Sequence, residues 1–229
     1  SAASDVYKRQ VFPMPEEGKQ WDVSAIWDGK ALGADTAKFQ LTYFGRDSEN
    51  LLQLMSRNFF FFYTNAAKAK VNGLEIQADM SWQKWDVNLQ ATYTKPKDVF
   101  YDMTKLPGYD SNTIAGSLTY QPQWEGTARL TYRPDTNWSL FTQLRYVDWM
   151  VTDPIPLTTG AVKRQSSLTT MDVGVKYKFN KSLQLAVGCN DVLNKANDMY
   201  LNMYGNGEIR NIQYPIQGRT YYATLQYTY

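Results

Sequence analysis

The chain has 229 residues and a net charge of +2, with 43% hydrophobic, 20% charged and an unusually high 15% aromatic residues. It contains no histidine and one cysteine, Cys189, which excludes imidazole-based catalysis, histidine-ligated metals and multi-cysteine metal sites. The small net charge gives no strong field towards nucleic acid, and no apolar run approaches the roughly 18 residues of a membrane-spanning helix. Such an aromatic and polar chain is typical of a transmembrane β-barrel.

The first residues, SAASDVYKRQ, do not join the pattern that follows and lack the apolar core of a signal peptide. They resemble translated vector or adapter sequence at the ends of metagenomic reading frames, whereas the alternative is an ordinary mobile terminus. We therefore expect residues 1–10 to be a non-native leader of a chain truncated at its start.

From Trp21 onward, apolar and polar residues alternate with a period of two, which predicts β-strands. We expect about nine strands of roughly 9–13 residues, long for a soluble sheet but suited to tilted membrane strands. The polar side carries whole charged side chains, which the core of a soluble sandwich could not bury unpaired. The pattern predicts an all-β fold, an antiparallel transmembrane β-barrel segment whose apolar face meets lipid. The expected strands cover 21–28, 38–43, 73–82, 85–94, 127–133, 138–146, 171–179, 182–189 and 221–229.

Short and long connections alternate along the chain, as do the periplasmic turns and extracellular loops of outer-membrane barrels. Short turns are expected near 29–36, 83–84, 133–137 and 180–181, and long polar loops near 46–64, 95–123, 149–167 and 195–217. The aromatic residues nearest the short turns belong to the apolar face or its edge, which indicates an aromatic girdle; they are Trp27, Trp82, Trp85, Tyr132, Trp138, Phe179 and Tyr229. A soluble aromatic-rich sandwich explains the alternation but not this clustering. We expect the aromatic run at 59–63 to begin a strand above the membrane.

Three stretches resemble the barrel of TonB-dependent outer-membrane receptors. Residues 214–229, YPIQGRTYYATLQYTY, resemble the last strand of that family, in which a Pro-x-Gly-Arg motif leads into alternating apolar residues. Residues 185–200 resemble the preceding strand through the motif NDVLNK at 190–195. Residues 65–75 resemble the stretch in which Gly-Leu-Glu begins a long strand.

The resemblance implies that residues 11–229 are the C-terminal portion of a barrel of about 22 strands, roughly strands 14 to 22. An odd number of strands agrees, because complete single-chain bacterial barrels have an even number, and lipid does not tolerate open edges. The plug domain, the TonB-contacting segment and the signal peptide would then be missing.

The implied function is energised uptake of a scarce nutrient across the outer membrane of a Gram-negative bacterium. The nutrient is expected to be siderophore-bound iron, cobalamin or a similar chelate, or a glycan, with haem least favoured because histidine is absent. The implied partners are outer-membrane lipid, the TonB complex through the missing plug, the barrel-assembly machinery and the chelate or glycan ligand. No cofactor and no metal site are expected.

Two alternatives belong to other classes. One is a self-contained outer-membrane adhesin or structural barrel, which an intact start and signal just upstream would favour. The other is a soluble carbohydrate-binding module, which solubility without detergent would favour. We expect no enzymatic activity, because no nucleophile, base or phosphate-binding loop accompanies the carboxylates.

Family members bind substrate with extracellular loops and plug apices. By this resemblance, the candidate substrate-binding residues are loop aromatics: Tyr101, Tyr109, Trp149, Tyr200 and Tyr204. The alternative is that these rings pack loop against loop or lie at the outer lipid interface.

The terminal alternation resembles the signal read by the barrel-assembly machinery, carried by Tyr221, Leu225, Tyr227 and Tyr229. Charged residues of the lumen side are expected to pair with each other or with the plug; they are Glu75, Asp79, Asp86, Arg129, Arg133, Arg145, Asp172 and Lys176.

Overall fold

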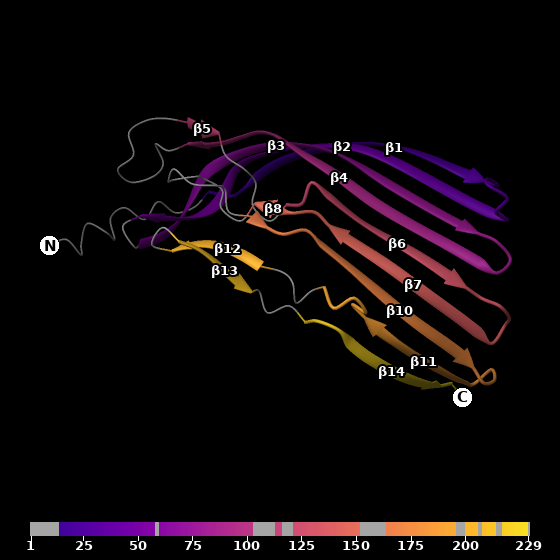
Figure 1. Cartoon of the computed structure of the whole chain (residues 1–229). Coiled ribbons are helices and arrows are strands. Elements are labelled where there is room, and N and C mark those ends of the chain that lie inside the picture. The colour runs from indigo at the N-terminus through magenta and orange to yellow at the C-terminus, as the bar shows by residue number, and fades with distance from the viewer. Residues whose placement is uncertain are drawn as a thin grey trace. The chain divides into compact units, whose positions relative to one another are not determined.

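A computed structural model describes residues 14–57, 60–102, 113–115, 121–151, 164–195, 200–205, 208–213 and 217–228 (Figure 1). All regular elements in these ranges are β-strands. Within the same ranges, no helix is long and apolar enough to span a membrane. The all-β prediction is confirmed.

One large sheet contains most of the strands. Its order is β1-β2-β3-β4-β6-β7-β10-β11-β14, and β5 pairs with β4 beside this path. Nine strands follow the path, so the predicted number is confirmed. Each strand of this path pairs with the next strand of the path along the chain, and the path skips only the short strands β5, β8, β9, β12 and β13. This is the topology of an up-and-down antiparallel barrel segment. The bounds are β1 Glu17–Gly29, β2 Thr36–Arg57, β3 Phe60–Ser81, β4 Trp85–Asp102, β5 Thr113–Ala115, β6 Trp124–Tyr132, β7 Trp138–Val147, β10 Leu168–Lys178, β11 Leu183–Asn190 and β14 Thr220–Tyr227.

The structure divides into two compact units. Unit 1 comprises residues 1–21, 44–72 and 95–118, and unit 2 comprises residues 22–43, 73–94 and 119–229. The boundaries fall within the four long strands β1 to β4, so each of these strands contributes to both units. The strands β6, β7, β10, β11 and β14 lie wholly in unit 2.

The strands of unit 2 have an apolar face, which we call the outer face, and a polar face. Antiparallel pairing places one apolar row across six strands, from β4 to β14: Trp85, Tyr132, Leu140, Val175, Val187 and Ala223. Trp85, Leu140 and Val187 keep 42%, 37% and 42% of their surface exposed. A sheet that presents large apolar side chains in this way needs an apolar surrounding, which hydrocarbon supplies.

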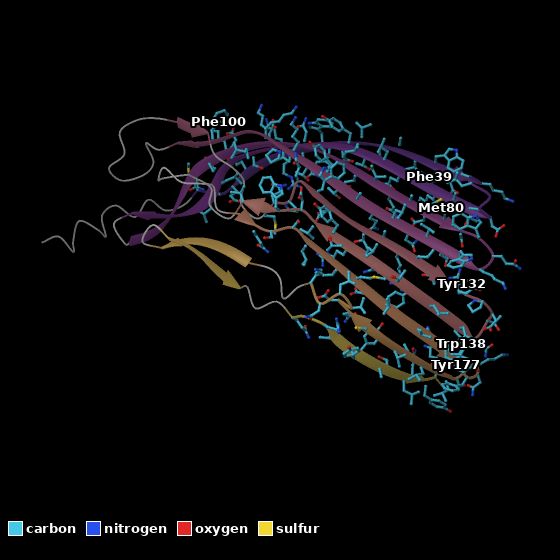
Figure 2. All side chains as sticks on the ribbon, viewed as in Figure 1. Phe39, Met80, Phe100, Tyr132, Trp138 and Tyr177 are labelled. Carbon is cyan, nitrogen blue, oxygen red and sulfur yellow. The ribbon has the colours of Figure 1, made fainter. Side chains whose placement is uncertain are left out.

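Aromatic rings gather at the end of unit 2 that carries the short turns. Trp85 stacks on Tyr132 with ring centroids 4.2 Å apart, and Trp138 lies 4.5 Å from Tyr177. Figure 2 shows Tyr132, Trp138 and Tyr177 at this end of their strands. Three of the aromatic residues expected near the short turns, Trp85, Tyr132 and Trp138, therefore lie in ring contacts at this end, whereas Tyr229 lies outside the described residues.

A second aromatic pair marks the other end of the outer face. Tyr93 and Trp124 lie 4.6 Å apart between centroids. Tyr93 follows Trp85 by eight residues on β4, which corresponds to about 26 Å of strand at the usual rise per residue. The nine residues from Trp85 to Tyr93 fall within the roughly 9–11 residues that a tilted strand needs to cross a membrane, so the outer face of unit 2 matches one membrane thickness.

Unit 1 contains the portions of β1 to β4 that are remote in sequence from the short turns at 29–36 and 83–84. Alternate positions of β3 are buried there, including Ala67 and Ala69 with 1% and 3% of their surface exposed. The Asn65 Nδ2 donates hydrogen bonds to the carbonyl oxygens of Met14 at 2.8 Å and Asn50 at 2.6 Å. The segment before β1 is thereby joined to β2 and β3.

The expectation of a long loop over 46–64 is wrong, because β2 and β3 continue through most of it. β4 likewise continues into the loop expected at 95–123, as far as Asp102. The alternation signal fails there because charges replace apolar residues on one strand face: Lys68 pairs with Glu49 at 3.4 Å, and Lys70 with Asp47 at 3.9 Å. The expectation that the aromatic run begins a strand is confirmed, since β3 starts at Phe60.

Candidate functional site

The polar face of unit 2 is the candidate functional surface. Antiparallel pairing aligns a second row across β4, β6, β7, β10, β11 and β14, and it consists of Asp86, Thr131, Phe141, Gly174, Gly188 and Tyr222. This row is one residue out of step with the apolar row, so it lies on the opposite face of the sheet. The expected lumen-side charges include Asp86, which belongs to this row. Arg129, Asp172 and Lys176 lie an even number of positions from its members and therefore on the same face.

An ion pair lies on this face near the short turns. The Arg133 guanidinium, just beyond the end of β6, pairs with the carboxylate of Asp86, which also accepts a hydrogen bond from the Ser81 hydroxyl. The hydrogen bond to Asp86 raises the pKa of Arg133 above its usual range. The expected pairing among polar-face charges is confirmed for these two residues.

On the same face, the carboxylate of Asp79 accepts hydrogen bonds from two side-chain amides. Its two carboxylate oxygens accept hydrogen bonds from Asn88 Nδ2 at 2.7 Å and from Gln77 Nε2 at 2.8 Å. These charged and amide side chains of β3 and β4 therefore have hydrogen-bond partners, as polar groups on the wall of a barrel require.

Two glycines make room for aromatic rings on the polar face. A Cβ at Gly174 would lie 2.4 Å from the Phe141 ring, and a Cβ at Gly188 would lie 2.4 Å from the Tyr222 ring. The rings therefore occupy the space that side chains at these two positions would take. The Arg129 guanidinium carbon lies 4.1 Å from the centroid of Phe141, in cation–π geometry.

Sequence reasoning missed this aromatic cluster, because Phe141 and Tyr222 stand at positions of their strands where the alternation predicts polar side chains. The signal that could have found it is glycine in the interior of two adjacent strands, at Gly174 and Gly188. Such glycines mark a close approach of other groups to the backbone.

A pocket of about 410 Å³ lies towards the other end of the polar face. It is formed by polar residues of β7, β10 and β11, including Arg145, Thr170, Asp172 and Asn190, and by apolar side chains such as Leu168. Arg145 makes no ion pair with another residue in the described part of the chain. The pocket thus offers one cationic group among hydroxyl, amide and carboxylate groups.

The NDVLNK motif at 190–195 forms a turn that borders this pocket. Its Asp191 is buried, has a positive φ of 46°, and donates its backbone N–H to Asp172 Oδ1 at 2.8 Å. The Asp191 Oδ1 accepts the backbone N–H of Lys195 at 3.0 Å, which closes the turn. Asp and Asn tolerate the left-handed backbone region better than most residues, which accounts for their use here.

The same turn contacts the segment that leads into the last strand. Asn194 also has a positive φ, 53°, and its Oδ1 accepts the backbone N–H of Arg219 at 3.0 Å. Asn190 Nδ2 donates to Thr220 Oγ1 at 3.3 Å. The motif therefore connects the end of β11 to the start of β14.

The candidate substrate-binding residues fall in several elements. Tyr101 lies in β4, where its Cα is paired with Ile114 of β5. Tyr200 and Tyr204 lie in β12, and Tyr109 lies outside the described residues. Trp149 follows β7 with 38% of its surface exposed, and its backbone N–H donates to Asp148 Oδ1 at 2.9 Å.

The backbone brings two of the expected long loops together. A four-stranded sheet of order β13-β12-β9-β8 is formed by β8 Met150–Val151, β9 Arg164–Gln165, β12 Tyr200–Gly205 and β13 Glu208–Gln213. The pairing of Leu201 with Gln165 joins the loop after β7 to the loop after β11. Trp149 adjoins β8, so the sheet links its segment to the strand that carries Tyr200 and Tyr204.

The candidate insertion residues lie on β14. Tyr221, Leu225 and Tyr227 are 76%, 68% and 66% exposed, and Tyr229 lies outside the described residues. Cys189 is a buried free thiol whose Cα pairs with that of Tyr221. In the described ranges, no three acidic, histidine or cysteine side chains gather in a way that would hold a metal ion.

The chain is similar in fold to solved structures of a transporter and of receptors. The chain is similar to the copper transporter OprC, with 15% identity and a TM-score of 0.65 over 96% of this chain and 32% of that one. It is also similar to the siderophore receptor PiuA from Acinetobacter baumannii, with 17% identity and a TM-score of 0.64 over 94% of this chain and 29% of that one. The ferric-catecholate import receptor Fiu from E. coli K12 gives 16% identity and a TM-score of 0.62 over 93% of this chain and 28% of that one.

These identities show the fold alone, and the chain spans no more than 32% of the length of each of these three proteins. No curated protein matches the chain. A protein-family model described as TonB dependent receptor-like, beta-barrel, matches residues 10–192, which is most of the sequence. The chain therefore belongs to the TonB-dependent receptor-like β-barrel family, and its sheet is part of such a barrel.

Proposed function

We propose that the protein carrying this chain is an outer-membrane receptor that takes up a scarce metal chelate in a Gram-negative bacterium, with siderophore-bound iron as the foremost candidate. TonB-dependent receptors are transporters rather than enzymes, and membership in this family is the main support for the proposal. The names of similar structures, a copper transporter and siderophore receptors, favour a metal or metal chelate over cobalamin or a glycan.

The observation that carries the proposal is the contrast between the two faces of unit 2. One face exposes apolar and aromatic side chains over about one membrane thickness, and the other carries an ion pair, amides and a polar pocket. Such a sheet suits the wall of a water-filled passage through a membrane. The described fold and the comparisons offer no support for the alternative of a self-contained adhesin.

The proposal assigns roles to residues and partners. Aromatic residues at the long-loop end, Tyr101, Tyr109, Trp149, Tyr200 and Tyr204, contact the chelate, because aromatic rings offer flat apolar area to a planar ligand group. The TonB complex energises release through a plug carried by the whole receptor, and the barrel-assembly machinery inserts the barrel through the β14 segment. Under this proposal, residues 11–229 are the C-terminal part of the barrel, and residues 1–10 are a non-native leader.

Uptake by the whole receptor tests the proposal. The full-length gene is expressed in a Gram-negative host that lacks its own ferric-siderophore receptors, and a matched host also lacks TonB. We expect radiolabelled iron from a ferric catecholate or hydroxamate to accumulate in the first host and not in the second. Accumulation that does not depend on TonB would contradict the transport mechanism. TonB-dependent uptake of cobalamin or of an oligosaccharide, without iron uptake, would contradict the proposed ligand.

A further inference from the structure

The pocket of about 410 Å³ on the polar face of unit 2 is lined by two opposite charges, Arg145 and Asp172. Arg145 lies on β7 and Asp172 on β10, which are neighbouring strands (Figure 1). The Cα of Arg145 is paired with that of Thr170, so Asp172, which follows Thr170 at the next position on the same face, is a diagonal neighbour of Arg145. Diagonal neighbours in a sheet lie roughly 7–8 Å apart, within reach of long side chains.

The two charges nevertheless do not pair with each other. Arg145 is exposed and makes no ion pair within the described part of the chain. Asp172 Oδ1 accepts the backbone N–H of Asp191 at 2.8 Å, whereas Oδ2 has no partner among the residues that the structure describes. The pocket therefore holds an available guanidinium close to an available carboxylate oxygen.

The other carboxylates near the pocket do not neutralise Arg145. Glu125 on β6 is also a diagonal neighbour, because Arg145 is paired with Thr127, but Glu125 makes no ion pair with it and does not line the pocket. Asp191 lines the pocket, is buried, and accepts the backbone N–H of Lys195 at 3.0 Å. Its role is to close the turn after β11.

The rest of the lining combines an apolar wall with neutral hydrogen-bonding groups. Val147 and Leu168 are Cα partners on β7 and β10, and Met150 of β8 adds a third apolar side chain. The neutral polar groups include the Thr170 hydroxyl and the Asn190 amide. A pocket of this size and mixture is typical of a small-molecule site, and it fits a ligand with an apolar part beside two opposite charges.

A zwitterionic α-amino acid has this combination of groups. Its ammonium nitrogen and its carboxylate carbon are joined through a single Cα and lie about 2.5 Å apart. A guanidinium binds a carboxylate with two parallel hydrogen bonds, and an ammonium donates charge-assisted hydrogen bonds to a carboxylate oxygen. A ligand with one charge would leave either Arg145 or Asp172 without a partner, whereas a zwitterion satisfies both.

We propose that this pocket binds a free α-amino acid with an apolar side chain. The ligand carboxylate accepts hydrogen bonds from Arg145, its ammonium donates to Asp172 Oδ2, and its side chain packs against Val147, Met150 and Leu168. Such binding goes beyond the proposed chelate uptake and does not depend on it, because no metal takes part.

Fluorinated probes and the purified full-length receptor test the pocket. The zwitterion is para-fluoro-L-phenylalanine, the N-acetyl form of the same compound carries only the carboxylate, and para-fluorophenethylamine carries only the ammonium. The fluorine NMR line width of each probe is followed as receptor in detergent is added, and the line width in receptor-free micelles is subtracted. We expect the zwitterion to bind about tenfold more tightly than either singly charged probe, because each of these leaves one charged group of the pocket without its partner.

Single variants separate the two charge contacts. R145Q should weaken binding of the zwitterion about tenfold, so that it binds no better than the amine. D172N should also weaken the zwitterion about tenfold, so that it binds no better than the N-acetyl probe, and this variant keeps an oxygen that can accept the Asp191 N–H. K176Q and E125Q are the matched controls, since they remove one charge of each sign from the polar face outside the pocket, and they should leave the three affinities unchanged.

Equal binding of the three probes would overturn the proposal, because the ring alone would then account for binding. No broadening beyond the micelle value would also overturn it, since the pocket of the whole receptor would then be closed to amino acids. Equal losses in R145Q and K176Q, or in D172N and E125Q, would do the same. Resistance of the folded barrel to detergent unfolding on a gel is recorded for each protein, and if a variant fails it, the preference of the unmodified receptor among the three probes decides. A receptor that binds the zwitterion as expected but takes up no ferric chelate would contradict the proposed function alone.

Discussion

The side chain of Asn194 holds the backbone of Arg219, accepting its N–H at 3.0 Å. The residues are 25 positions apart, so this bond joins the turn after β11 to the segment that precedes β14. Asn194 performs this role with a left-handed backbone, φ 53°.

Asn194→Ala should therefore lower the stability of the receptor by about 2 kcal/mol, through loss of the hydrogen bond and strain in the left-handed region. The midpoint of urea unfolding in detergent measures this effect. Asn194→Gly is the matched control, since glycine also lacks the side chain but accepts the same φ without strain. If the alanine and glycine variants are equally stable, backbone strain has no part in the effect.

The glycine–aromatic packing on the polar face gives a second prediction. Gly188→Val places a side chain where the Tyr222 ring lies, since even a Cβ would be 2.4 Å from it. We expect a loss of about 2 kcal/mol, typical of overpacking. The double variant Gly188→Val/Tyr222→Ala should recover most of it in the same unfolding measurement, because the ring that clashes is gone. Purely additive losses would show that the two residues do not interact.

Much of this fold follows from the sequence because a membrane strand has a period of two and both its faces are constrained. The nine-strand path and the apolar row through Trp85 and Leu140 are of this kind. The parts of β2 and β3 within the loop expected at 46–64 could not be predicted from the sequence. Charged residues such as Asp47 and Lys70 stand there at positions that are apolar elsewhere in these strands. Strand pairing there is maintained by backbone bonds and buried inner positions, which alternation of hydrophobicity does not report.

The candidate site was less accessible to sequence reasoning. The family resemblance marked NDVLNK at 190–195, but the contacts of Asp191 with Asp172 and of Asn194 with Arg219 depend on chain segments brought together by the fold. The cluster of Phe141 and Tyr222 arises from cross-strand pairing, which a single strand pattern cannot specify.

The ion pair at the short-turn end gives a third prediction. Asp86→Asn and Arg133→Gln should each lower stability by less than about 1 kcal/mol, because both side chains retain contact with water. A double-mutant cycle in urea unfolding should give a coupling energy of about 0.5 kcal/mol between them. Ser81→Ala is the control that removes the other hydrogen bond to Asp86 while leaving the ion pair in place. A coupling energy of zero would mean that the contact contributes nothing to folding.

Ligand binding gives a fourth prediction, which rests on the proposed function. Trp149 is exposed and its backbone is held by the buried Asp148, so removal of its ring should leave the fold intact. We expect Trp149→Ala to raise the Kd for the ferric chelate about tenfold, and Trp149→Phe to retain most of the affinity because it keeps an aromatic face. Fluorescence-quenching titration of the purified receptor measures both constants. An unchanged Kd in the alanine variant would remove Trp149 from the proposed binding surface.

The last strand gives a fifth prediction, concerning insertion. Tyr221, Leu225 and Tyr227 alternate along β14 and are all exposed on one strand face, and the chain continues the alternation to Tyr229. If this alternation is the signal read by the barrel-assembly machinery, deletion of Tyr229 in the full-length receptor should lower its level in outer-membrane fractions several-fold. Replacement of Tyr229 by Phe keeps an aromatic ring at this position and should leave that level unchanged, because the ring rather than the hydroxyl supplies the apolar contact. Equal outer-membrane levels for the deletion and the unmodified receptor would show that assembly does not read this residue, and the exposed rings of Tyr221 and Tyr227 on β14 would then serve only as lipid-facing surface.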